Sequence, residues 1–464
     1  MLKTLEKSCI FALKILEKSC KIMLKRKIIN ELQEWSKLEH KKALIVEGAR
    51  QVGKTTTIRE FGKKNYKHFV EINFIKKPIA KQAFDGNLDT DTVVMNLTAM
   101  DFGPFVKGKT LVFFDEIQEC PNARTAIKFL VEEGYFDYIE SGSLLGINYK
   151  GSDSEEPVGE IASIPVGYES SLEMYPLDFE EFLWACGISG EIIDVLKKSY
   201  NSRSEVPPFI HDRIMECFRK YLVIGGLPEV VNTFVTTHDF NAITKVQSDL
   251  VAGYRKDISK YAGSDKVLVK RIFDCIPSQL AKQDKRFLLS EIEDGASRRR
   301  YADPTQWLVD AGLANYAINV NAFSLPFANV ENRKLFKLYM HDTGIVTYMS
   351  LNGKQFSVMN GEIDVNEGAL TENFVANELA KKELALHYYD KKSKHELDFI
   401  LSGDDGIIVV EVKSGKSYMK HASLDYALAN EKDNISRAIV LCASNVEIVD
   451  DIVYLPLYMA MFVR

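Results

Sequence analysis

Residues 48–55 read Gly-Ala-Arg-Gln-Val-Gly-Lys-Thr and match the pattern GxxxxGK[ST]. The apolar run 42–49 predicts a buried strand before this loop, and residues 53–62 predict a helix after it, which Gly62 should end. A glycine-rich loop in this position turns its backbone N–H groups towards a phosphate, and the helix N-terminus adds its positive dipole end. The stretch therefore predicts a phosphate-binding loop (P-loop) in an α/β fold with a parallel sheet.

The residue types in the loop predict separate tasks. Gly48 and Gly53 permit the backbone angles that the loop needs. Lys54 should reach the β- and γ-phosphates, and Thr55 offers a hydroxyl ligand to Mg²⁺. The pattern predicts ATP and Mg²⁺ as cofactors. The predicted nucleotide-binding residues are Gly48, Ala49, Arg50, Gln51, Val52, Gly53, Lys54, Thr55 and Thr56.

A second acidic motif follows at 111–116, where four apolar residues precede Asp115 and Glu116. Parallel sheets bind ligands at the carboxyl ends of their strands, so we expect both carboxylates beside the P-loop. Asp115 would hold Mg²⁺, and Glu116 would act as the general base towards water. The alternative is two acids that merely cap a strand. A further strand candidate, 68–74, falls between the two motifs in the chain and suits a P-loop class with an inserted strand.

Residues 135–143 predict another strand, and Ser143 lies at its tip. A polar residue in that place can sense the γ-phosphate, and we predict this catalytic role for Ser143. The alternative is an ordinary cap between strand and loop.

Changes of pattern along the chain predict four parts. Strand and helix alternate at first, helical patterns follow, and a second alternating unit begins beyond about residue 365. The helical part contains the cationic stretch SRRRY (297–301) and predicts a winged or three-helix module that contacts DNA phosphates or is simply solvated. The predicted parts are an N-terminal basic helical extension (1–41), a P-loop ATPase domain (42–205), a helical lid with a winged-helix-like region (206–330) and a C-terminal domain (331–464).

Composition limits the class of protein. The 464 residues suggest about three domains, and 46% hydrophobic residues are enough for a real core. No apolar run reaches the roughly 18 residues of a membrane span. Lys and Arg number 59 against 65 Asp and Glu, for a net charge of −6, which argues against a basic nucleic-acid binder as a description of the whole chain.

The N-terminus is an exception to this balance. LKTLEKSC at 2–9 returns as LKILEKSC at 13–20, and residues 1–42 hold 11 Lys and Arg against 5 acids. This segment is either a basic amphipathic helix for a membrane or nucleic acid, or a solvated extension before Met23. The seven cysteines are scattered without a metal-binding pattern, so we expect a cytoplasmic protein without stable membrane insertion.

Six segments in order carry a resemblance to a known family. They are GARQVGKTT, FFDEIQECPNA, ESGSLLG, YPLDFEEFLWA (175–185), YLVIGGLPEVV (221–231) and LFKLYMHDTG (335–344). Over about residues 23–464 the chain resembles the bacterial and archaeal AAA-type P-loop ATPases that carry a C-terminal domain of unknown function with a nuclease-like core. The resemblance implies ATP hydrolysis.

One position departs from that family. Gly167-Tyr168 stands where much of the family has a Gly-Arg pair, a candidate arginine finger. The departure argues against activation by a neighbouring subunit in a ring oligomer. Arg50 and Arg124 are the two arginines that could compensate.

The C-terminal unit predicts a second site. Strand alternation puts Glu411 and Lys413 on one face, and a hairpin through 401–406 brings Asp398 beside them. This arrangement is similar to the PD-(D/E)XK core of restriction-endonuclease-like α/β domains. It implies that Asp398 and Glu411 hold Mg²⁺, that Lys413 positions water, and that Glu372 completes the metal shell. The alternative is a cross-strand ion pair.

Two functions remain open at this point. In the first, ATP hydrolysis is coupled to a DNA-directed, nuclease-like C-terminal domain. In the second, the chain is a nucleotide-dependent switch whose C-terminal domain binds a protein or DNA partner without cleavage. A membrane-associated ATPase would rest on the basic N-terminus alone.

Overall fold

The computed structural model describes residues 23–143, 165–351 and 367–464, apart from residues 283, 284, 294, 297, 392, 393 and 416. The N-terminal duplication at 2–20 lies outside the described residues. Within the described ranges, no helix is both long and apolar enough to cross a membrane.

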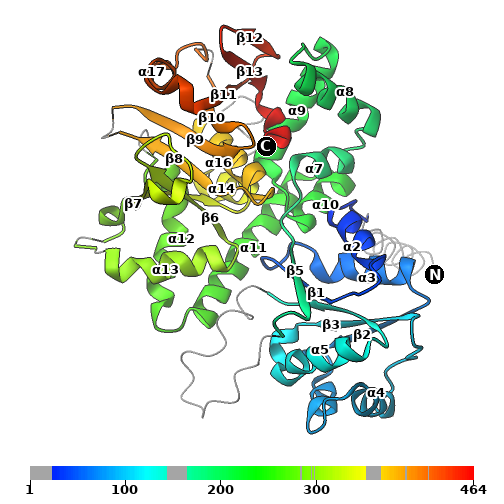
Figure 1. Cartoon of the computed structure of the whole chain (residues 1–464). Coiled ribbons are helices and arrows are strands. Elements are labelled where there is room, and N and C mark those ends of the chain that lie inside the picture. Colours follow the sequence, from blue (N-terminus) through cyan, green and yellow to red (C-terminus); the bar gives the residue numbers. More distant parts are fainter. Residues whose placement is uncertain are drawn as a thin grey trace, which may run out of the picture.

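The first sheet has five parallel strands in the order β2-β3-β4-β1-β5 and lies at one end of the molecule (Figure 1). This confirms the predicted parallel α/β architecture. Both faces of the sheet are covered by helices, which explains why every residue of β3 is buried. Its strands are β1 (Ala43–Glu47), β2 (His68–Asn73), β3 (Thr110–Asp115), β4 (Asp137–Ser141) and β5 (Glu169–Glu173).

Two separate cores form on the two faces of this sheet. Leu44 and Phe113 pack with α2 and α3 on one face, and Ile45 and Phe114 pack with the remaining helices on the other. The helices are α2 (Ile28–Ser36), α3 (Lys54–Asn65), η1 (Pro78–Phe84), α4 (Thr90–Ala99), η2 (Ile117–Glu119) and α5 (Pro121–Glu133).

The sheet has an inserted strand, as the sequence predicts: β4 lies between β1 and β3, and the candidate 68–74 forms the outer strand β2. One local expectation differs, because helix α3 continues through Gly62 to Asn65. Gly62 serves packing rather than termination, because a Cβ there would lie 2.3 Å from Cδ2 of Phe69 on the neighbouring strand.

A helical part follows and joins the two sheets (Figure 1). Helix α7 begins with a capping box, in which Asp178 accepts from the backbone of Glu181 and the Glu181 side chain accepts from that of Asp178. The helices are α7 (Phe179–Ala185), α8 (Gly190–Ser202), α9 (Pro208–Ile224), α10 (Pro228–Thr237), α11 (Phe240–Tyr261), η3 (Gly263–Asp265), α12 (Lys266–Leu280), η4 (Leu289–Glu291), α13 (Arg298–Asp310) and α14 (Thr343–Leu351).

The second sheet is mixed and has eight strands in the order β12-β13-β11-β10-β9-β8-β6-β7. Its strands are β6 (Ala314–Val320), β7 (Glu331–Met340), β8 (Leu386–Asp390), β9 (Glu396–Gly403), β10 (Gly406–Lys413), β11 (Ile435–Cys442), β12 (Glu447–Val449) and β13 (Ile452–Pro456). The elements around it are η5 (Phe327–Asn329), α16 (Glu367–Ala380), α17 (Ala422–Glu431), η6 (Lys432–Asn434) and η7 (Leu457–Phe462).

This sheet includes one strand, β6, from the part that the sequence predicts as winged-helix-like. Helices α11 to α13 are followed by the antiparallel pair β6 and β7, and β6 continues into the sheet through parallel pairing with β8. The sheet therefore begins at Ala314, before residue 331, where the sequence predicts the C-terminal domain to start.

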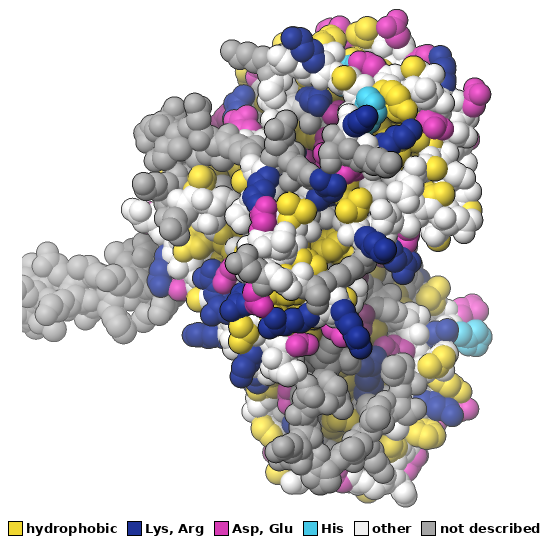
Figure 2. Space-filling model, turned by 90° about the vertical axis from the view of Figure 1, so that its left-hand side faces the viewer, with side chains coloured by type: hydrophobic (Ala, Val, Ile, Leu, Met, Phe, Trp, Pro, Cys, Tyr) yellow, Lys and Arg dark blue, Asp and Glu magenta, His cyan; other side chains and the backbone are white. Residues whose placement is uncertain are grey.

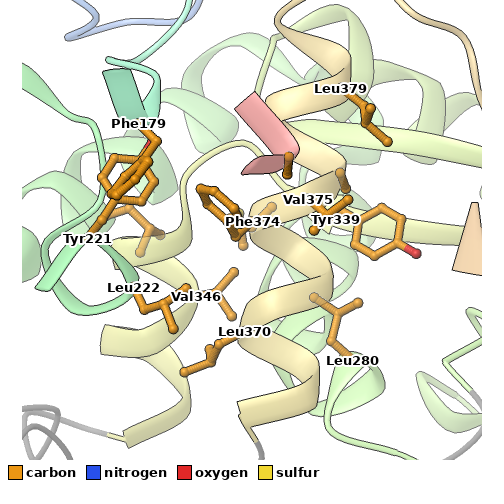
Figure 3. Packing of buried hydrophobic residues seen from close by; sticks show 14 of the residues in the cluster. Phe179, Tyr221, Leu222, Leu280, Tyr339, Val346, Leu370, Phe374, Val375 and Leu379 are labelled. Carbon is orange, nitrogen blue, oxygen red and sulfur yellow. The ribbon is translucent and has the colours of Figure 1, made fainter. Parts of the chain in front are cut away.

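Helix α16 ties the helical part to the second sheet through one shared core (Figure 3). The ring of Phe374 lies 4.9 Å from that of Phe218, 5.7 Å from Tyr221 and 5.9 Å from Phe179, measured between centroids. These edge-on contacts join α16 to α7 and α9.

Three of the segments that carry the family resemblance meet at one junction. The N–H of Leu177 donates to the carbonyl of Gly226 at 2.7 Å, and the N–H of Gly226 donates to Oδ2 of Asp342 at 2.6 Å. A Cβ on Gly226 would lie 2.0 Å from the carbonyl oxygen of Leu177, and one on Gly225 would lie 2.2 Å from Oδ1 of Asp342. The two glycines are therefore required by close backbone approach.

Gly226→Ala should destabilise the protein, because the added methyl group forces Leu177 and its segment apart. We expect the free energy of unfolding to fall by about 1–3 kcal/mol, measured as a lowered midpoint of thermal or urea unfolding. The control is Gly190→Ala at the start of α8, where an added Cβ meets no atom within 4 Å. Equal midpoints for the two variants would contradict the close approach.

Candidate functional site

The P-loop has the conformation that its glycines predict. Gly48 has φ of +145° and a Cβ on it would lie 2.2 Å from the carbonyl oxygen of Met174, while Gly53 has φ of +100° and precedes α3. Nζ of Lys54 donates to the carbonyls of Gly48 and Ala49, at 2.8 Å each. The ammonium group therefore lies inside the curve of the loop, where phosphate oxygens would replace the carbonyls.

Asp115 is the centre of a hydrogen-bond cluster beside the loop. Its carboxylate is 3% exposed and accepts from Oγ1 of Thr55 at 3.0 Å, from Nδ2 of Asn73 at 2.6 Å and from Oγ of Ser141 at 2.7 Å. Asn73 and Ser141 end β2 and β4 in the same register as Asp115 on β3. Parallel strands therefore deliver all three polar groups to one edge of the sheet.

The oxygens of Thr55 and Asp115 suit Mg²⁺, since hydroxyl and carboxylate oxygens are the donors that this hard cation prefers. Both residues come from elements that the P-loop fixes, α3 and the end of β3. The pair therefore fits the predicted metal role.

Glu116 follows Asp115 in the left-handed conformation, with φ of 60°. A non-glycine residue seldom adopts this region, and such strain concentrates at functional sites. Nε2 of Gln118 donates to Oε2 of Glu116 at 2.5 Å. The Gln118 side chain thus fixes the position of the Glu116 carboxylate.

Ser143 is buried and lies two residues beyond the end of β4, at the edge of the described residues. The serine that contacts Asp115 is Ser141. Sensing of the γ-phosphate by Ser143 stays a prediction, and Ser141 is a second candidate for that role.

The charge of Lys54 is sensitive to its surroundings. Burial lowers the pKa of Lys54 to about 8, although the negative charges of Glu116 and Asp115 oppose the shift. The lysine is therefore protonated at neutral pH and becomes neutral a little above it.

Arg50 connects the P-loop to helix α11. Its guanidinium donates to Oδ1 of Asp257 at 2.7 Å and to the hydroxyl of Tyr261 at 2.9 Å. The hydroxyl of Tyr254 contacts the Arg50 carbonyl oxygen at 3.4 Å. The other arginine of interest, Arg124, pairs with Glu169 at 3.2 Å on the opposite face of the sheet. Both arginines are therefore held by acids of their own chain.

Comparison with known proteins agrees with this geometry. Residues 40–183 match the family model described as "AAA domain". This part of the chain, which contains the P-loop and the five-stranded parallel sheet, is therefore similar to an AAA domain. Residues 215–355 match a domain of unknown function, DUF8612, and residues 367–459 match another, DUF4143. A search of the curated proteins finds no match.

Two solved structures with some similarity come from Pyrococcus abyssi and Thermotoga maritima. The Walker-type ATPase of Pyrococcus abyssi is 14% identical with a TM-score of 0.40, over 70% of this chain and 96% of that one. A RuvB variant of Thermotoga maritima is 12% identical with a TM-score of 0.26, over 62% of this chain and 87% of that one.

The second predicted site lies on α16, β9 and β10. Glu372 is fully buried and accepts from Nζ of Lys337 at 3.0 Å and from the hydroxyl of Tyr339 at 2.6 Å, and it also pairs with Lys285. Although burial opposes the shift, the two lysines lower the pKa of Glu372 to about 2. Its charge is therefore neutralised by the protein itself.

Asp398 and Glu411 lie across the β9–β10 hairpin, as the sequence predicts. Oδ2 of Asp398 accepts from the N–H of Val412 at 2.9 Å, and Nζ of Lys413 donates to Oε1 of Glu411 at 2.6 Å. Oε2 of Glu411 is buried without a hydrogen-bond partner. Burial, Glu372 and Glu411 raise the pKa of Asp398.

Lysine side chains lie within 4 Å of all three acids. Within the described ranges, no group of three or more His, Cys, Asp or Glu side chains is arranged to hold a metal ion. Glu372 in particular forms ion pairs with two lysines, Lys285 and Lys337. The predicted roles of Asp398, Glu411 and Lys413 stay predictions, and we derive no metal-dependent step from them.

Several residues that complete the two sites are not in the sequence prediction. Asn73 and Ser141 could have been found as polar residues at strand ends, the signal that led to Ser143 instead. No local sequence pattern points to Lys285, Lys337 or Asp257, because these residues reach their partners from elements that are distant in the chain.

ATP affinity should fall as the pH rises from 7 to 9, because Lys54 loses its proton with a pKa near 8 and then no longer attracts phosphate. For a single group the loss at pH 9 is about tenfold. The dissociation constant of a fluorescent ATP analogue, measured between pH 7 and 9, checks this. Lys54→Arg keeps its charge over this range, so a fall of the same size in that variant would contradict the assignment.

Proposed function

We propose that the chain hydrolyses ATP with Mg²⁺ and uses its nucleotide state as a switch. The observation that carries the proposal is the cluster at Asp115, whose carboxylate is hydrogen-bonded to Thr55 of the P-loop and to polar side chains from two neighbouring strands. An acid at a strand end that is hydrogen-bonded to the loop threonine is suited to phosphoryl transfer. An acid that only caps a strand needs no hydrogen bond to the P-loop.

Each residue of the site has a step in this proposal. Lys54 neutralises negative charge on the transferring γ-phosphoryl group. Mg²⁺, when held by Thr55 and Asp115, supplies further charge neutralisation. Glu116 accepts the proton of the attacking water, and Gln118 keeps its carboxylate oriented.

Arg50 provides the link from nucleotide to the rest of the chain. A γ-phosphate offers its guanidinium a second anionic partner, in competition with Asp257 on α11. Nucleotide binding would thereby weaken the contact between loop and helix, and this change is the switch.

For the C-terminal site we propose partner binding without cleavage. The supporting observation is that Lys285 and Lys337 already neutralise Glu372. The cleaving alternative is favoured by the unpartnered Oε2 of Glu411 and by its neighbour Lys413. We also propose a cytoplasmic location, in keeping with the scattered cysteines.

Glu116→Gln should lower ATP turnover at least about 100-fold while ATP binding is retained, because only the proton acceptor is removed. Phosphate release and binding of a fluorescent ATP analogue measure the two properties. The matched control is Glu132→Gln on the exposed side of α5, and Lys54→Ala should lose binding as well. Turnover that survives in Glu116→Gln would remove the assigned base.

Cleavage of DNA should not depend on Glu411. Plasmid and single-stranded DNA are incubated with Mg²⁺ or Mn²⁺, with and without ATP, and with the wild type or Glu411→Ala. We expect the same low background of DNA cleavage from the wild type and from Glu411→Ala. The variant Glu447→Ala, on the exposed strand β12, controls for nuclease contamination of the protein preparations. Cleavage that is lost only in Glu411→Ala would establish the nuclease instead.

A further inference from the structure

The end of α11 and the start of α12 form a strongly cationic surface on an acidic chain. Residues 254–271 hold six Lys and Arg against two Asp, whereas the whole chain has a net charge of −6. One of those two acids, Asp257, is already paired with Arg50. Figure 2, which faces the α12 and α13 side, shows Lys and Arg side chains gathered in a band across the middle of the molecule.

Four lysines form the centre of this surface, and we call them the lysine ridge: Lys256, Lys260, Lys266 and Lys270. All four are exposed, and in the described part of the chain none has an ion pair with an acid. Neighbouring arginines differ, since Arg255 pairs with Asp274 and Arg271 with Glu293. The four lysines of the ridge, all among the described residues, thus carry positive charge without a salt bridge, although Nζ of Lys260 donates to the hydroxyl of Tyr261 at 2.8 Å.

The spacing of the ridge suits a row of phosphates. Lys256 and Lys260 are four residues apart on α11, and Lys266 and Lys270 are four residues apart on α12. Such pairs share one helix face and lie about 6 Å apart along the axis. The short element η3 joins the two helices, which pack against each other, so the two pairs lie at the same end of this helix pair.

We propose that the lysine ridge binds the phosphate backbone of double-stranded DNA. A row of lysine ammonium groups suits contact with backbone phosphates, which supply most of the affinity of non-specific DNA binding. A membrane fits less well, because Val267 is the one large hydrophobic side chain exposed between residues 254 and 271, and an interfacial helix needs an apolar face.

The same helix connects the ridge to the ATP site. Asp257 and Tyr261, which hold Arg50 of the P-loop, stand directly beside Lys256 and Lys260 on α11. DNA bound on the outer face therefore shifts the helix whose inner face contacts the loop. This coupling rests on the proposed function, whereas DNA binding itself does not.

The test uses the full chain and a fluorescein-labelled duplex of 30 base pairs, without nucleotide. Two double variants, Lys256→Gln/Lys260→Gln and Lys266→Gln/Lys270→Gln, are compared with Lys63→Gln/Lys64→Gln at the exposed end of α3. Each ridge variant should bind at least tenfold more weakly at 100 mM KCl, and the control should match the wild type. The slope of log affinity against log salt should fall from about −4 to about −2.

Failure to bind the duplex, or equal binding by all variants, would overturn the proposal, as would binding of phosphatidylserine vesicles but not of DNA. Thermal unfolding of the variants identifies any loss of fold. Because the assay contains no ATP, its failure leaves the proposed ATPase intact. In a separate assay DNA should raise ATP turnover of the wild type and not of the ridge variants, and a protein that binds DNA but hydrolyses no ATP contradicts only the proposed function.

Discussion

The close backbone contact around Gly226 is the constraint on which the arrangement of the whole chain depends. Asp342 is fully buried there and accepts from the N–H groups of Gly226 and Ile345, at 2.6 and 3.0 Å. A buried carboxylate without such donors would be costly, so these hydrogen bonds hold three segments in one place. The segment after β5, the loop between α9 and α10 and the start of α14 therefore stay together, and the ATPase domain is joined to the second sheet at that point.

The acids of the ATP site and of the C-terminal site have different kinds of hydrogen-bond donors. Asp115 is held by neutral donors, a threonine, an asparagine and a serine, which leave its negative charge in place for a cation. Glu372 is held by two lysines, which cancel its charge. A buried carboxylate thus keeps its negative charge available in one site and is neutralised within the protein in the other, and the identity of the hydrogen-bond donors decides which.

Local sequence patterns predict the P-loop, both acidic motifs and the β9–β10 hairpin, because strand alternation and glycine placement act over a few residues. They do not determine the register between strands. Ser141 and Ser143 both follow a strand-like run, and only the pairing of β4 with β3 brings Ser141 to Asp115. Gly62 looks like a helix end until Phe69 is placed beside it. The partners Arg50 and Asp257 lie 207 residues apart, a separation at which no local pattern operates.

Helix α11 connects the Gly226 junction to the P-loop. Near its middle, the side-chain amide of Gln247 donates to the carbonyl of Val223 at 2.8 Å, close to the Gly226 junction, while Asp257 near its end contacts the P-loop. The two points are ten residues apart, or about 15 Å of continuous helix. This continuous stretch of helix sets the distance between the junction and the P-loop, because its backbone hydrogen bonds allow little change of length. The P-loop is therefore attached to the Gly226 junction through a single helix.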